Sequence, residues 1–345
     1  MSSHYRISLD AMGGDHGLSV TVPAALESLK KYDDISLILV GDEAQITEHL
    51  TQHSAADNPR ITVRHASQTV GMDEPPALAL RGKKDSSMRI AINLVKEGEA
   101  DAVVSAGNTG ALMATARFVL RTLPGIDRPA ICSQIPSNNG HTHMLDLGAN
   151  IDSTAEHLYQ FAVMGSELTR AIDGIEEPTV GLLNIGQEDI KGNEQVKSAN
   201  RLLKAGHLNY IGYVEGDDIF SDHVDVVVCD GFVGNVSLKT IEGLAKMLSN
   251  ELKKHFTKNL LTKLMALVAM PVLKALSKQF DPRSYNGASF LGLQGIVVKS
   301  HGGADSFSLA NAISVARKEV IAEVPQKIRH RLQALVDDEQ QAKAS

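Results

Sequence analysis

Two glycine-rich segments of this chain carry the residue types that bind anions. Residues 10–17 read DAMGGDHG and residues 105–110 read SAGNTG. Each follows an apolar strand pattern, at residues 5–9 and 102–104, and each precedes a helical pattern. Glycine lets the backbone approach a ligand closely, and the first N–H groups of a helix have no partner inside the helix. The sequence therefore predicts that a phosphate or an oxyanion binds at these turns.

The side chains in these two turns allow structural as well as chemical roles. Asp10 could cap the helix that follows, and a histidine in a turn, such as His16, is often structural rather than an acid or a phosphate ligand. A cap by Asn108 or Thr109 is compatible with anion binding, because a capped helix still offers free N–H groups. We predict that the anion is bound by Gly13, Gly14, Asp15, Ser105, Gly107, Asn108, Thr109 and Gly110.

Three further turns follow strand patterns and add candidate catalytic groups. Residues 184–194 read NIGQEDIKGNE, residues 230–237 read DGFVGNVS, and residues 300–305 read SHGGAD. Lys191 can meet an anion as a point charge, whereas a charged loop in solvent is the alternative. Ligands of open α/β sheets bind at the carboxyl ends of the strands, so turns that converge at one edge would form a single site. The candidate catalytic residues are Lys191, Asn235 and His16.

The composition excludes several function classes. A formal net charge of −7 and an aromatic content of 4% argue against nucleic-acid binding. The two cysteines, Cys132 and Cys229, lie in apolar runs without a CxxC partner, which fits a reduced cytoplasm and gives no metal site. The order GGxxG is not the GxGxxG dinucleotide fingerprint. We expect neither a cofactor nor a metal, because no metal-ligand spacing is evident in Asp146, Asp152, Asp217 and Asp218.

Strand and helix patterns alternate along almost the whole chain, which predicts βαβ units and a parallel sheet with helices on both faces. We expect one large α/β domain at residues 1–336, whose last helical pattern runs from 306 to about 336, and a charged, frayed tail at 337–345. The N-terminus has no signal stretch, and no segment reaches the ~20 apolar residues of a membrane-spanning helix.

Residues 249–280 are expected to form a protruding amphipathic helical segment. Leu261, Leu264, Met265 and Val268 are spaced as one apolar stripe of a helix, and lysines flank the run. Pro271 should kink or end this helix, which would make a hairpin tip. We predict reversible membrane contact through this stripe. The alternative is a dimer interface or a core helix.

In several sequence blocks the chain resembles the acyl-ACP:phosphate acyltransferases, the PlsX family of phospholipid synthesis. The blocks run in family order and read ISLDAMGGDHG, VSAGNTGALMA, GIDRPA, LDLGANID, LLNIGQEDIKGNE, VVVCDGFVGNVSLKTIEG, SYNGASFLGL and KSHGGAD. The resemblance implies a phosphotransacetylase/isocitrate-dehydrogenase-like three-layer α/β/α sandwich with a mostly parallel sheet, and a homodimer. It also implies transfer of a fatty acyl group from acyl-ACP to inorganic phosphate, which yields acyl-phosphate and free ACP.

This implied chemistry agrees with the residues. Phosphate is itself an anionic nucleophile and the carrier thiolate is a good leaving group, so the enzyme needs only to position the substrates and to stabilise an oxyanion. The basic cluster Arg81, Lys83 and Lys84 is the candidate docking site for the carrier, although a solvated loop is the alternative. We expect a cytoplasmic, peripherally membrane-associated enzyme that hands its product to a glycerol-3-phosphate acyltransferase.

Three competing functions remain on the sequence alone. The first is a phosphate acyltransferase that uses acyl-CoA, as a phosphotransacetylase does. The second is an NAD-dependent decarboxylating dehydrogenase on the same scaffold, which needs a dinucleotide site and a carboxylate-bound metal. The third is a membrane scaffold without enzymatic activity, which leaves the glycine turns unexplained.

Overall fold

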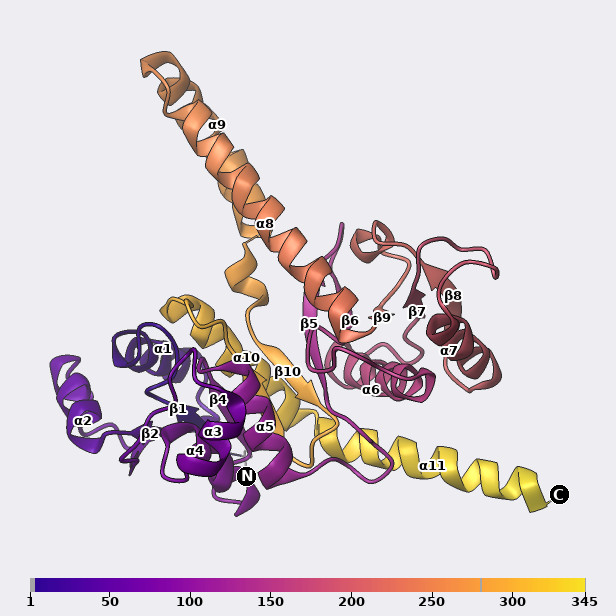
Figure 1. Ribbon diagram of the computed structural model, residues 1–345. Coiled ribbons are helices and arrows are strands. Elements are labelled where there is room, and N and C mark those ends of the chain that lie inside the picture. The colour runs from indigo at the N-terminus through magenta and orange to yellow at the C-terminus, as the bar shows by residue number, and fades with distance from the viewer. Residues whose placement is uncertain (1–3, 280, 345) are drawn as a thin grey trace.

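The computed structural model describes residues 4–279 and 281–344, without the side chains of residues 275–279, 282, 336 and 338–344. An eleven-stranded sheet with the order β3-β2-β1-β4-β11-β10-β5-β6-β9-β7-β8 runs through the molecule (Figure 1). Its strands are β1 (Tyr5–Asp10), β2 (Ile35–Gly41), β3 (Ile61–His65), β4 (Ala102–Ser105), β5 (Ala130–Pro136), β6 (His141–Leu145), β7 (Val180–Leu183), β8 (Tyr210–Val214), β9 (Val226–Val228), β10 (Ala288–Leu291) and β11 (Ile296–Lys299).

Helices cover both faces of this sheet. They are α1 (Leu18–Lys31), α2 (Glu43–Gln52), α3 (Pro76–Gly82), α4 (Ser87–Lys96), α5 (Thr109–Leu120), α6 (Ala155–Asp173), α7 (Glu194–Ala205), α8 (Gly231–Phe256), α9 (Leu260–Gln279), α10 (Ser306–Ile321) and α11 (Val324–Ala344). One face packs against α3, α4, α5 and part of α8, and the other against α1, α2, α10, α6, α7 and α11. The predicted three-layer α/β/α sandwich with a mostly parallel sheet is confirmed.

Alternate residues of each strand point to opposite faces of the sheet, which explains why the strands read as continuous apolar runs. In β4, Val103 packs with α4 and α5 while Val104 packs with α1 and α10, and both side chains are fully buried. The core is aliphatic, as the scarcity of aromatic residues predicts. Phe161 is the one aromatic side chain among the largest fully buried side chains of the described residues.

The strands form two parallel groups that run in opposite directions. One group is β3-β2-β1-β4-β11 and the other is β6-β9-β7-β8. Between them, β11 with β10, β10 with β5, and β5 with β6 are three successive antiparallel pairs, and three reversals invert the direction. The carboxyl ends of the two groups therefore do not share one edge. The expectation that all the glycine turns converge at one edge of the sheet is wrong.

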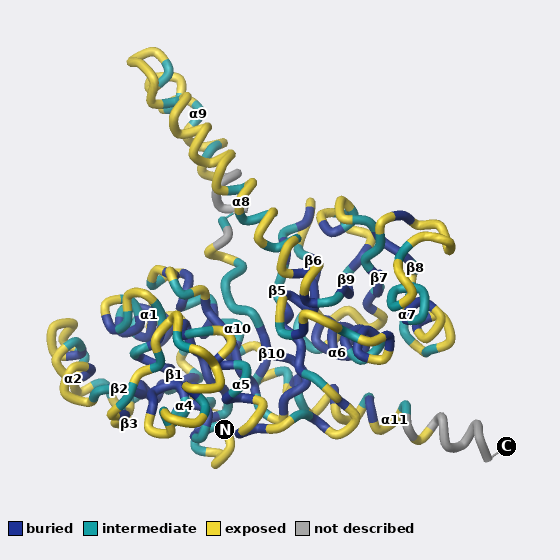
Figure 2. The backbone as a smooth tube through the Cα atoms, in the orientation of Figure 1, coloured by how far each residue is buried: buried dark blue, intermediate teal, exposed yellow. Residues whose placement is uncertain are grey.

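The chain also protrudes as an arm, which consists of α8 and α9 (Figures 1 and 2). The predicted start of the protruding segment at residue 249 falls inside α8, which is a single helix of 26 residues. Pro271 lies inside α9 and does not end it, so the turn of the hairpin is at residues 257–259 instead. The proline removes one backbone donor opposite Leu267, and the cost is small because both residues are exposed to water.

The C-terminal helical pattern is two helices rather than one. Helix α10 ends at Ile321, and Glu323 adopts a positive φ of 52° before α11 begins. Helix α11 continues through the charged residues after 336 to Ala344.

Candidate active site

Three of the predicted turns meet at the carboxyl ends of β1, β4 and β11. We call residues 10–17, 105–110 and 300–305 the first turn cluster. The backbone N–H of Asp15 donates to the carbonyl of Gly302 at 2.9 Å, and the N–H of Ser300 donates to the carbonyl of Ser105 at 2.9 Å. A Cβ on Gly14 would lie 3.0 Å from the same Gly302 carbonyl oxygen, so the close approach of these turns requires glycine there.

Several residues predicted as anion ligands lie on the buried side of this cluster and hold its turns together. Asp10 is buried and does not cap α1, whose N-cap residue is Gly17. The Ser105 hydroxyl donates to Asp10 Oδ2 at 2.7 Å and accepts the N–H of Gly107 at 3.0 Å. A Cβ on Gly13 would lie 2.8 Å from the nitrogen of Gly107. Ser105 and Gly107 are buried and shape the turn from below.

The start of α5 is the exposed part of the first turn cluster. Asn108 caps the helix, because its Oδ1 accepts the N–H of Ala111 at 2.9 Å. The Asn108 amide also donates to the carbonyl of Met72 at 2.8 Å, so this side chain tethers a neighbouring loop. Thr109 and Gly110 are exposed, and their N–H groups belong to the first helical turn, which has no internal acceptors. Asp15 and His16 of the same cluster are exposed as well.

A second turn cluster lies at the carboxyl ends of β6, β9 and β7 and comprises residues 146–150, 184–193 and 230–235. The N–H of Gly231 donates to the carbonyl of Asn150 at 2.9 Å, and the Asn235 amide donates to the carbonyl of Leu147 at 3.1 Å. The hydrogen-bonding capacity of the Asp146 carboxylate is saturated. The carboxylate accepts the N–H groups of residues 131, 148, 149 and 150 and the side-chain amide of Asn150. This saturation makes Asp146 a structural residue rather than a metal ligand.

Lys191 projects from the exposed loop between β7 and α7. Its backbone N–H donates to the carbonyl of Glu188 at 2.9 Å, and Gly192 adopts a φ of 89° next to it. The side chain of Asn184 closes the base of the loop by donating to the carbonyl of Gly186 at 3.0 Å. Within the described part of the chain, no carboxylate is paired with the Lys191 ammonium. Its charge is therefore available to a ligand.

Helix α8 begins at the second turn cluster. Asn235 belongs to its first turns, and Lys239 lies four residues later on the same helical face. Burial is the main cause that lowers the pKa of Lys299, the last residue of β11, and the charge of Lys239 lowers it further. The Asn235 side chain itself faces the second turn cluster, where its amide donates to the carbonyl of Leu147.

Lys299 is a residue of this site that the sequence patterns did not single out. Its side chain is 8% exposed, and its ammonium donates to the carbonyl oxygens of Ala106, at 3.2 Å, and Ser300. Burial lowers the pKa of Lys299 to about 8, and the neighbouring carboxylates of Asp10 and Asp15 oppose this shift. The sequence signal that could have identified Lys299 is a lysine that directly ends an apolar strand and precedes a glycine turn.

The basic cluster lies beside the first turn cluster. Pro76 at the start of α3 would contact a Cβ on Gly110 at 2.8 Å, so α3 flanks the open end of α5. Lys83 is not free, because its ammonium pairs with Glu74 at 2.6 Å. Arg81 and Lys84 are exposed and remain available to a partner.

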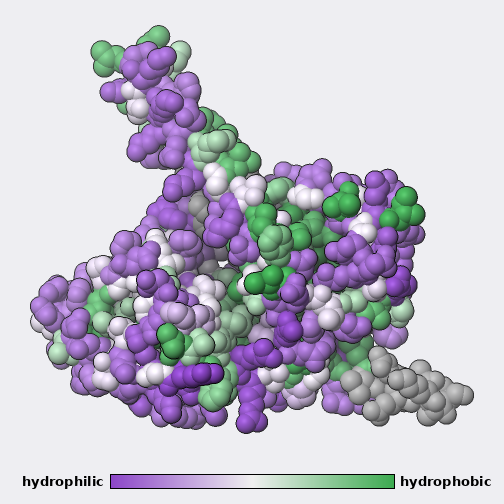
Figure 3. All heavy atoms as spheres, in the orientation of Figure 1, coloured by the Kyte–Doolittle hydropathy of each residue, from purple (hydrophilic) through white to green (hydrophobic). Residues whose placement is uncertain are grey.

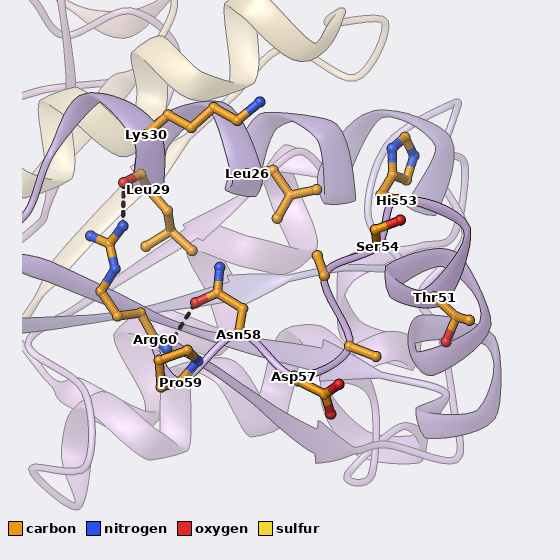
Figure 4. A pocket seen from close by; sticks show the side chains of 12 residues that line it. Leu26, Leu29, Lys30, Thr51, His53, Ser54, Asp57, Asn58, Pro59 and Arg60 are labelled. Atoms are coloured by element: carbon orange, nitrogen blue, oxygen red, sulfur yellow. Dashed lines mark hydrogen bonds between the residues drawn. The ribbon is translucent and has the colours of Figure 1, made fainter.

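Two other features of the described residues lie away from these turns. His141 Nε2 and His143 Nε2 are 3.2 Å and 2.7 Å from Asp173 Oδ2, a set of metal-type ligands at the start of β6 rather than at its carboxyl end. A surface pocket of about 830 Å³ lies among α1, α2 and the loop before β3 (Figure 4). In that pocket the Arg60 guanidinium is engaged by the carbonyls of Leu29 and Tyr32. The pocket borders the beginning of β3, whereas the candidate site is at the carboxyl ends of the strands.

Comparison with known proteins agrees with this geometry. The family described as "Fatty acid synthesis protein" matches residues 5–327. The chain is 63% identical over 326 residues to the phosphate acyltransferase of Methylococcus capsulatus, a match that covers 94% of this chain and 96% of that protein. It is 58% identical over 337 residues to the phosphate acyltransferase of Halorhodospira halophila, which covers 97% of this chain and 98% of that protein.

Solved structures show the same fold at low sequence identity. A phosphotransacetylase from Streptococcus pyogenes superposes with a TM-score of 0.61 at 19% identity and covers 92% of this chain and 94% of that one. The EutD phosphotransacetylase from Staphylococcus aureus superposes with a TM-score of 0.60 at 16% identity and covers 92% of this chain and 96% of that one. The predicted phosphotransacetylase-like fold is thus confirmed. By sequence, the chain belongs to the phosphate acyltransferase family and is an acyltransferase.

Proposed function

We propose that this enzyme transfers a fatty acyl group from acyl-ACP to inorganic phosphate. The observation that carries the proposal is the first turn cluster, where an open helix start and glycine turns offer backbone N–H groups to an anion. The described residues provide no activated thiol, because burial raises the pKa of both Cys132 and Cys229 well above its usual range. Phosphate itself then acts as the nucleophile.

The reaction needs one bond to form and one to break. A phosphate oxygen attacks the thioester carbonyl carbon, and the negative charge moves to the carbonyl oxygen of the tetrahedral intermediate. Collapse of the intermediate breaks the C–S bond, and the carrier leaves as a thiolate that takes a proton from water. We assign phosphate binding to the exposed groups of the first turn cluster, Thr109 and Gly110 among them, and oxyanion stabilisation to Lys191 and Asn235. His16 is assigned to the phosphate.

A fatty acyl donor fits the surroundings of Asn235. Phe232, Val233 and Val236 are exposed on the first turns of α8. Figure 3 shows apolar surface around the base of this helix. An apolar chain that lies on this surface is removed from water close to the candidate catalytic residues. Arg81 and Lys84 supply positive charge for an acidic carrier protein next to the start of α5.

The test of this function is a phosphate-dependence assay. We expect purified enzyme to release free ACP from palmitoyl-ACP only when inorganic phosphate is present, and hydroxylamine to trap the acyl-phosphate. Equal thioester loss without phosphate would identify a thioesterase and refute the proposal. Charge reversal of Arg81 and Lys84 to Glu should raise KM for palmitoyl-ACP while leaving KM for phosphate unchanged. A preference for palmitoyl-CoA would identify an acyl-CoA-using enzyme instead.

We further propose that the arm contacts a membrane reversibly, where the labile acyl-phosphate passes to a glycerol-3-phosphate acyltransferase of phospholipid synthesis. No helix among the described residues is long and apolar enough to cross a bilayer. The predicted stripe on α9, Leu261, Leu264, Met265 and Val268, is 56–80% exposed. Apolar surface is visible at the tip of the arm in Figure 3. A shallow insertion with flanking lysines gains from both apolar burial and anionic lipid.

Flotation with anionic vesicles tests this contact. Leu264→Asp combined with Val268→Asp should abolish vesicle binding without changing the oligomeric state or the activity on palmitoyl-ACP in solution. Ile211→Asp, which adds one negative charge to an exposed apolar position on β8, is the control for Leu264→Asp alone and for Val268→Asp alone, and it should still bind. If the double variant dissociates or unfolds, the stripe is a packing surface between protomers of the expected homodimer and the membrane proposal fails.

A further inference from the structure

The side chain of Lys299 links two of the three turns of the first turn cluster, the turn after β4 and the turn after β11. It is the last residue of β11 and lies opposite Ser105, the last residue of β4. Its ammonium donates to the carbonyl of Ala106 in the turn after β4 and to the carbonyl of Ser300 in the turn after β11. Both carbonyls therefore face inward, toward the lysine.

The ammonium is buried without a direct ion pair among the described residues. Its hydrogen bonds to Ala106 and Ser300 go to neutral carbonyls, whereas a lysine has three donors. The charged groups that act on it are Asp10 at the end of β1, Asp15 in the turn after β1, and Lys239 on α8. A buried charge without a paired counter-ion is costly, and an anion that binds nearby offsets that cost.

We propose that Lys299 is a positioning residue of the phosphate site: its ammonium ties the turns after β4 and β11 together and supplies the fixed positive charge that holds inorganic phosphate on them. The inference rests on the proposed function, since it names how that site recognises its phosphate. It assigns Lys299 no proton transfer and no contact with the acyl donor. Loss of the charge should therefore weaken phosphate binding selectively.

The first test is Lys299→Gln, which keeps hydrogen-bond donors and removes the charge. Titration calorimetry with inorganic phosphate alone should show affinity at least about 10-fold weaker, and KM for phosphate should rise while KM for palmitoyl-ACP stays within about twofold. Unchanged phosphate affinity in the folded variant overturns the inference. A parallel rise of both KM values also overturns it, because it shows a general distortion of the site.

The second test needs no change of the buried residue. Phosphate affinity of the unaltered enzyme should fall as pH rises through about 8, where Lys299 loses its proton, and this fall should be missing in Lys299→Gln. A profile that is unchanged in Lys299→Gln contradicts the inference.

The two proposals fail in different ways. If the enzyme binds phosphate through Lys299 but does not cleave palmitoyl-ACP in its presence, the acyl donor is misassigned and the inference stands. If cleavage depends on phosphate and its KM is insensitive to Lys299, the function stands and the inference is wrong.

Discussion

Replacing Lys191 with alanine is expected to lower the turnover of palmitoyl-ACP with phosphate by ~100-fold or more. An ammonium that stabilises the oxyanion only in the transition state contributes about 2.7–4 kcal/mol to lowering the barrier, as single donors in oxyanion holes do. The fold should be unaffected, because Lys191 is exposed and its ammonium has no carboxylate partner in the described part of the chain. Steady-state kinetics with circular dichroism of the variant is the measurement.

Lys204→Ala provides the matched control for this variant. Lys204 lies on α7 and its ammonium pairs with Asp189, in the same loop as Lys191, at 2.9 Å. The control removes one positive charge from the same region, so it reports any general effect of net charge on substrate attraction. We expect near-normal turnover in Lys204→Ala. Near-normal turnover in Lys191→Ala would instead place Lys191 on the solvated surface, which is the alternative that its sequence context left open.

Gly234→Ala is expected to destabilise the protein severely, although it adds only one methyl group. A Cβ at this position would lie 1.9 Å from the carbonyl oxygen of Asp146 and 2.9 Å from the Cys229 sulfur. Backbone atoms cannot move aside as a flexible side chain does, so we expect a loss of about 3 kcal/mol or more in the free energy of unfolding. Because Asn235 is the next residue, activity should fall as well.

The control for this substitution is available in the same helix. Gly243 lies on α8, and a Cβ there would meet no atom within 4 Å. Gly243→Ala should therefore stabilise the helix by about 0.5–1 kcal/mol, as alanine does relative to glycine in a helix interior. Urea denaturation of the two variants gives the comparison. Equal stability of Gly234→Ala and Gly243→Ala would show that α8 does not seat tightly on the second turn cluster.

Local sequence signals were sufficient to predict the α/β/α layers of the fold and the positions of the glycine turns. A buried strand, a glycine turn and a capped helix lie close together in the sequence, and the turns after β4, β9 and β11 have this form, whereas the helix after β1 begins at Gly17 without a side-chain cap. The direction of the strands was not predictable in the same way. It depends on β10 and β11, which are only four residues long and pair with strands more than 150 residues earlier in the chain.

At the site itself, residue type alone did not separate ligands from supports. Ser105 and Gly107 have the chemistry of an anion cradle, but the structure turns the Ser105 hydroxyl inward to the buried Asp10. Asn108 uses its side chain for a cap and a tether. Conversely, the sequence around Lys299 offered only a lysine at the end of an apolar strand as a signal, and the fold shows that this lysine is buried. The assignment of Lys191 and Asn235 to catalysis stays a prediction.

The reversal of strand direction has a mechanical consequence for the enzyme. Strand β11 is hydrogen-bonded to β4 on one side and to β10 on the other, so the backbone ladder is unbroken from β3 to β8. Where two lobes are joined only by peptide linkers, rotation of a few backbone bonds separates them. In this enzyme the continuous sheet joins the two parallel strand groups, so we expect them to move relative to each other only through a change in the twist of the sheet. That deformation is shared among many hydrogen bonds, so we expect the stiffness of the sheet to set the spacing between the first and second turn clusters.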